Sequence, residues 1–108
     1  MLGGVIKLPD CGSRDALPRC GSLLRVVNLC DRDVRVEMSA SMQPEATWHT
    51  LVPLVRAGAA YEPPNAAIYL PRGSRVRTVD ATQPEGRAVA GLDHGIVGDG
   101  MIVVVPAE

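Results

Sequence analysis

Hydrophobic and polar side chains alternate strictly through the stretch VRVEMSASM. Val34, Val36 and Met38 fall on one side of this pattern, and Arg35 and Glu37 fall on the other. A period of two is typical of a β-strand with one side in a core and the other in solvent. The pattern therefore predicts a strand in which the three apolar residues are buried and the two charged residues are exposed.

Short runs rich in β-branched residues recur along the rest of the chain. They are LLRVVNL, WHTLVPLV, AAIYL, SRVRTVDA, RAVAGL and MIVVVP. Leu23, Val26, Val27 and Cys30 also fit a helical period, but this fit fails after Val34, where the period becomes two. Pro53 lacks an N–H group, which predicts an edge strand or a bulge for WHTLVPLV. Together the runs predict an all-β fold, an antiparallel β-sandwich or barrel of about 6–8 short strands without a long helix. The predicted core includes Val34, Val36, Met38, Val76, Ile102 and Val104.

Proline and glycine mark the connections between these runs. Pro71-Arg72-Gly73 is expected to form a hairpin turn between AAIYL and SRVRTVDA. Gln83-Pro84-Glu85-Gly86 has the same chemistry before RAVAGL. The glycine-rich stretch LDHGIVGDG predicts a loop before the apolar closing strand.

The beginning of the chain differs in composition from the rest. Residues 1–21 contain four Gly and two Pro and show no regular period. They predict an extended N-terminal arm, followed by a β-sandwich domain over residues 22–108. So short an arm would bury little apolar surface on its own domain, so we expect it to contact neighbouring molecules. Its expected interface residues are Val5, Ile6, Leu8 and Leu17.

Composition and charge limit the kinds of partner that the chain is expected to bind. The chain has no Phe and one Trp, so its core must be aliphatic, with Trp48 expected as a large anchor. A formal net charge of −1 gives no reason to expect nucleic acid. The start of the chain lacks the pattern of an export signal, and no apolar run is long enough to span a membrane. Arg72, Arg75 and Arg77 form a local basic group, which a solvated face or a salt-bridging interface explains better than nucleic acid.

All three cysteines fall within CGSRDALPRCGSLLRVVNLC. Their spacing matches neither the close pairs of structural zinc sites nor a CxxC redox pair. We therefore expect thiols that serve packing, with Cys30 acting as a small hydrophobe and no bound metal. A disulfide between Cys11 and Cys20 stays open as an alternative.

The best candidate for a catalytic or metal-binding site is Asp93-His94-Gly95, with Asp99 nearby. A histidine beside carboxylates can act as a general base or bind a metal. No nucleophile or third ligand accompanies it, so a turn with a solvated His94 is the preferred interpretation. No catalytic residue, cofactor or small-molecule substrate is expected, and the chain is predicted not to be an enzyme.

Three stretches in order, LRVVNLCDRDVRVEM, WHTLVPLVRAGAAYEPPN and AIYLPRGSRVRTV, resemble the small β-sandwich structural proteins of tailed-phage virions. The resemblance covers residues 23–108. It implies a virion protein assembled in the host cytoplasm, most simply a capsid decoration or cement protein. The implied partners are capsid or tail proteins and copies of the chain itself.

A second group also looks similar, the bacterial extracytoplasmic sandwich domains, which include alginate O-acetylation accessory proteins. This similarity implies a carbohydrate- or protein-binding module. The chain departs from that group because no signal peptide is visible at its start. Neither resemblance transfers a functional residue.

Overall fold

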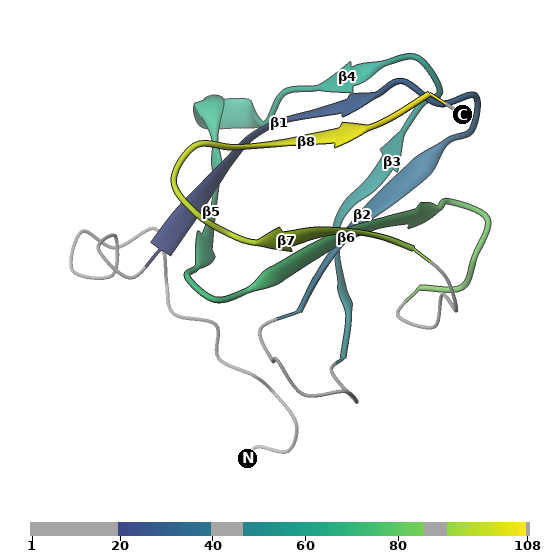
Figure 1. The fold of residues 1–108 in the computed structure, drawn as a ribbon. Coiled ribbons are helices and arrows are strands. Elements are labelled where there is room, and N and C mark those ends of the chain that lie inside the picture. Colours follow the sequence, from purple (N-terminus) through teal and green to yellow (C-terminus); the bar gives the residue numbers. More distant parts are fainter. Residues whose placement is uncertain (1–19, 40–46, 86–90, 108) are drawn as a thin grey trace.

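Two four-stranded β-sheets pack face to face and form a β-sandwich, as the sequence predicts (Figure 1). The computed structural model describes residues 20–39, 47–85 and 91–107. Its only helical element in these residues is a 3-10 turn at Pro64–Ala66, and no described helix could cross a membrane. The strands are β1 (Cys20–Asn28), β2 (Val34–Ser39), β3 (His49–Val55), β4 (Ala60–Tyr61), β5 (Ile68–Pro71), β6 (Arg75–Asp80), β7 (Leu92–Ile96) and β8 (Met101–Val105).

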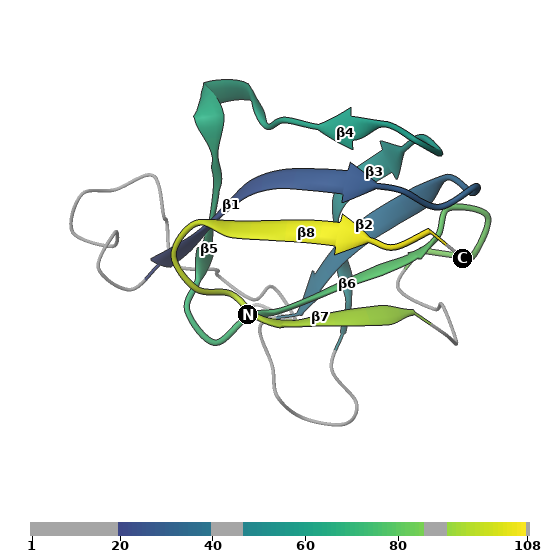
Figure 2. The same cartoon turned by 45° about the horizontal axis from the view of Figure 1, so that its top comes forward.

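Sheet A is built around β1. Strands β4 and β5 pair with β1 in antiparallel fashion, whereas β8 runs parallel to it (Figure 2). The register of the parallel pair places Leu23 beside Met101 and Asn28 beside Val105. The sandwich is thus antiparallel except for one pairing, which joins the first described strand to the last.

Sheet B has the order β3-β2-β6-β7, with all pairings antiparallel. β3 forms one edge of this sheet, and the β2–β3 ladder is interrupted by two register shifts. Pro53 lies in β3. The prediction of an edge strand or bulge at this proline is therefore confirmed.

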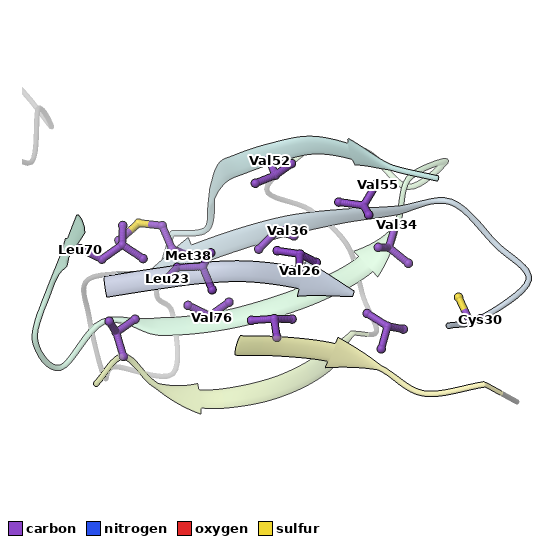
Figure 3. Close-up of a cluster of buried hydrophobic side chains, with 13 residues drawn as sticks. Leu23, Val26, Cys30, Val34, Val36, Met38, Val52, Val55, Leu70 and Val76 are labelled. Carbon is purple, nitrogen blue, oxygen red and sulfur yellow. The ribbon is translucent and has the colours of Figure 1, made fainter. Parts of the chain in front are cut away.

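The core lies between the two sheets and is aliphatic (Figure 3). Val34, Val36, Met38 and Val76 are buried there, as predicted. The predicted set of buried residues in β8 is wrong by one position along the strand. Ile102 and Val104 are exposed, and the alternate residues of the same strand face inward. A run of consecutive apolar residues carries no alternation, so its phase is set by pairing with β1. The inward residues are Met101, Val103 and Val105.

A turn does form after β5, but it is not a hairpin. The N–H of Ser74 donates to the carbonyl of Pro71 at 3.1 Å, and Gly73 has φ of +88°. Gly73 thus occupies the third turn position, where a positive φ is required. β5 and β6 belong to different sheets, so the turn carries the chain across the sandwich.

The first strand and the strand before β8 differ in position from the sequence prediction. β7 occupies residues that the sequence predicts to be loop, and Gly95 with φ of +89° lies at its bulge against β6. Most of the predicted strand RAVAGL lies outside the described residues. Cys20 and Gly21 open β1, so the first strand begins two residues before the expected domain boundary.

Candidate functional site

The outer face of β2 carries a buried charge cluster, which we define as Arg35, Glu37 and Arg77. Nε of Arg35 lies 3.0 Å from one carboxylate oxygen of Glu37, and Nε of Arg77 lies 2.8 Å from the other. Glu37 is fully buried, and Arg35 is 3% exposed. The predicted exposure of these two residues is therefore wrong. A buried carboxylate is tolerated here because two guanidinium groups compensate its charge.

Neighbouring groups complete this cluster. Arg35 donates to the carbonyls of Gln83 at 2.7 Å and Pro84 at 3.0 Å, which ties the segment after β6 to β2. The guanidinium carbon of Arg77 lies 4.2 Å from the centre of the Trp48 ring. Trp48 is only partly buried and does not belong to the core, contrary to the expectation. Its role is to stack on a charged group of sheet B.

The three arginines proposed as interface residues all form ion pairs within the chain. Arg72 contacts Asp99 at 2.7 Å, Arg75 pairs with Asp93, and Arg77 belongs to the charge cluster. Arg75 and Arg77 share β6, whereas Arg72 lies in the preceding turn. The remaining proposed interface residues lie outside the described part of the chain. They are Val5, Ile6, Leu8 and Leu17.

His94 is half-buried and lies in strand β7, so the expectation of a solvated turn residue is wrong. Its Nε2 is 2.8 Å from the hydroxyl of Thr78 on β6. Burial lowers the pKa of His94, and the negative charge of Asp93 partly opposes this. The pKa of Asp93 is itself lowered, chiefly because its carboxylate accepts the N–H of Gly95. No three His, Cys, Asp or Glu side chains among the described residues group together as metal ligands.

The cysteines have two different states. Cys30 is a free, buried thiol of the core and donates to the side-chain oxygen of Asn28 at 2.9 Å. Cys20 is disulfide-bonded, with its partner outside the described residues. The expectation that every thiol serves packing therefore does not hold for Cys20.

A hollow of about 450 Å³ lies at the end of the sandwich near Cys30. Its wall combines core side chains with the polar side chains of Thr78, Asp80 and Gln83. The Cys30 thiol is engaged by Asn28 and by the carbonyl of Arg32. This thiol therefore has a structural role in the wall.

Sheet A exposes several large apolar side chains on the side away from the core. Its exposed large side chains come from β1, β5 and β8, and we name this surface the apolar face. It consists of Leu24, Tyr69, Ile102 and Val104. Arg25, the register partner of Ile102, adds one charged side chain to this face and pairs with Glu62 at 3.5 Å. Exposed apolar side chains that gather on one side of a sheet are candidates for a protein contact site.

Comparisons with protein-family models, curated proteins and solved structures find no match for the chain. The class of the protein thus rests on its own geometry, an all-β sandwich with a buried charge cluster on one sheet and an apolar face on the other. The apolar face was missed from the sequence. The sequence predicts Ile102 and Val104 to be in the core, and Leu24 and Tyr69 stand out only once the sheet pairing is known.

Proposed function

We propose that the chain is a non-enzymatic structural protein of a tailed-phage virion, a decoration or cement protein that binds and stabilises the particle. The observation that carries this proposal is the apolar face. Leu24 and Tyr69 are 39% and 49% exposed, although such side chains stabilise a fold only when they are covered. Docked on capsid or tail proteins, the same side chains stabilise an assembly, and repetition over a lattice multiplies each weak contact.

The test measures binding to particles. The chain is expected in gradient-purified virions at a fixed ratio to the major capsid protein. Leu24→Lys should reduce its occupancy at least tenfold, because a charge then enters the apolar contact. Leu54→Lys is the matched control, since Leu54 is a similarly exposed leucine of the opposite sheet at 44%. Absence of the chain from virions, or equal effects of the two variants, would overturn the proposal.

One observation favours a second candidate, a bacterial extracytoplasmic carbohydrate- or protein-binding module. Cys20 is disulfide-bonded, and disulfides persist in oxidising compartments such as the periplasm as well as on virion surfaces. The two candidates differ in where the chain is found. Recovery from the periplasm with glycan binding, and none in virions, would establish the second candidate instead of the first.

A further inference from the structure

β8 differs from the other edge strands that the structure describes. Edge strands invite pairing with another chain, and proteins block this with charges, prolines, bulges or very short strands. β3 contains Pro53, β7 contains Asp93 and a bulge, β4 has two residues and β5 ends in Pro71. β8 is MIVVV, with no charge, proline or glycine. It pairs with β1 and with no second strand among the described residues.

The backbone groups at the free edge of β8 are identified by one hydrogen bond. The N–H of Leu29 donates to the carbonyl of Val105 at 2.8 Å, so the polar groups of Val105 point toward β1. The backbone groups of a strand alternate between its two neighbours. Those of Val103 therefore also point toward β1, and those of Ile102 and Val104 point to the free edge.

We propose that β8 pairs in antiparallel fashion with β8 of a second copy, about a two-fold axis at Val103. Ile102 then lies opposite the partner subunit's Val104, and the reverse pair follows by symmetry. These are hydrogen-bonded positions, so all four edge groups of each β8 find partners. The two copies of sheet A become one continuous sheet. This inference rests on the proposed function and supplies its copy-to-copy contact.

The neighbouring residues fix this register. Moving the axis to Val104 would place Ile102 opposite Pro106, which has no N–H to donate. Moving it to Ile102 would place Val104 opposite Gly100. The N–H of Gly100 already donates to the hydroxyl of Ser22 at 2.9 Å. Of these three axes, only the one at Val103 pairs backbone N–H and C=O groups that can all form hydrogen bonds with the second copy.

The side chains suit a second copy of the same chain. Ile102 and Val104 are 56% and 44% exposed on the outer face, and each Ile102 meets a Val104 across the axis as a β-branched pair. β8 has no charge, so the two-fold symmetry brings no like charges together. Pairing along so short a strand buries less than the roughly 1,000 Å² of a stable interface. The isolated chain should therefore associate with a dissociation constant of about 0.1–1 mM.

The experiment uses the full chain at concentrations from about 0.02 to 2 mM, which bracket the expected dissociation constant. Analytical ultracentrifugation should show a monomer–dimer equilibrium. Amide exchange at Ile102 and Val104 should slow at least threefold at the top of this range. A chain that stays monomeric, or amides whose exchange does not change, would overturn the proposal.

Variants test the contact itself. Ile102→Lys should abolish association, whereas Ile96→Lys should leave it unchanged, since Ile96 is equally exposed at 55% but lies on β7. Val104→Pro removes an edge N–H that faces solvent in the monomer, and should also abolish it. Circular dichroism checks that each variant is folded. If Val104→Pro proves unfolded, the comparison of the two lysine variants decides alone, and equal association by both contradicts β8 pairing.

The inference and the proposed function fail in different ways. A dimer that forms through β8 while the chain is absent from virions rejects only the proposed function. Virion occupancy at the expected ratio, with a chain that stays monomeric at about 2 mM, rejects only the pairing of β8.

Discussion

The carboxylate of Glu37 lies 3.0 Å from Nε of Arg35, with the Glu37 side chain fully buried and that of Arg35 nearly so. The pair lies on the outer side of a sandwich sheet, where charged side chains are ordinarily solvated. Arg77 on β6 supplies a second cation to the same carboxylate at 2.6 Å. The face of β2 away from the core is thus closed by charge pairing, and β2 is buried on both sides.

The charge cluster should respond sharply to the loss of its single anion. Glu37→Gln leaves two guanidinium groups facing a neutral amide in a buried site. We expect the free energy of unfolding to fall by about 3–5 kcal/mol, measured by urea denaturation. Asp99→Asn breaks the exposed pair with Arg72 and should cost about 0–1 kcal/mol. Equal losses in the two variants would show that burial of the cluster contributes nothing.

Two glycines that lie close together should tolerate alanine very differently. A Cβ at Gly21 would lie 2.5 Å from both the carbonyl oxygen of Gly98 and a methyl of Val97. Gly21→Ala should therefore force β1 away from the segment before β8, at a cost of about 1–3 kcal/mol or more. A Cβ at Gly98 meets nothing within 4 Å, so Gly98→Ala should stay within about 0.5 kcal/mol of the parent. Thermal unfolding of both variants checks this, and a reversed order contradicts it.

Asn28 should be more important for stability than its small side chain suggests. It is fully buried, its amide donates to the carbonyls of Arg32 and Val55, and its oxygen accepts the N–H of Cys30. Asn28→Ala leaves these backbone groups without their hydrogen-bond partner, and each loss should lower the free energy of unfolding by about 1–3 kcal/mol. Cys30→Ala is the comparison, because it keeps the backbone bond and should cost only about 1–2 kcal/mol. Chemical denaturation that ranks Cys30→Ala as the more damaging change would refute this assignment.

His94 predicts a pH dependence of stability. Its pKa is lowered from 6.5 by burial in the folded chain, so the unfolded chain binds a proton more readily. Stability from the neutral His94 should be fully present above pH 6.5 and should fall as the pH drops below 6.5. His94→Gln should remove this slope in denaturation curves, whereas His49→Gln, at an exposed position, should keep it. The lowered pKa of Asp93 acts separately, since its stabilisation is lost only as the pH falls below 3.8.

The sequence predicts those parts of the fold that local patterns specify. Alternation through Val34, Val36 and Met38 fixes which side of the strand is buried. The uniform apolar run in β8 contains no such information, so the prediction from the sequence exchanges its inward-facing and outward-facing residues. In the same way, Pro71 and Gly73 specify a turn, but whether the flanking strands pair depends on how the sheets pack.

The charge cluster and the apolar face could not be predicted for a related reason. Glu37 is neutralised by Arg77, whose place beside it depends on the pairing of β2 with β6. A charged residue in an alternating strand is most simply assigned to solvent, and only the ladder reveals Arg77 as a second partner beside Arg35. Strand β7 could not be predicted for the same reason. Asp93 disfavours a strand, and the residues that hold Asp93 and His94 in place, Arg75 and Thr78, lie on β6.

The parallel pairing of β1 with β8 also sets the order of events during synthesis. Leu23 finds its neighbour Met101 only after all the chain between them has left the ribosome. Contacts of such high sequence separation slow folding, because a long loop must close before they form. Until then the edge of β1 that β8 covers is open, and open strand edges make a folding chain prone to aggregation.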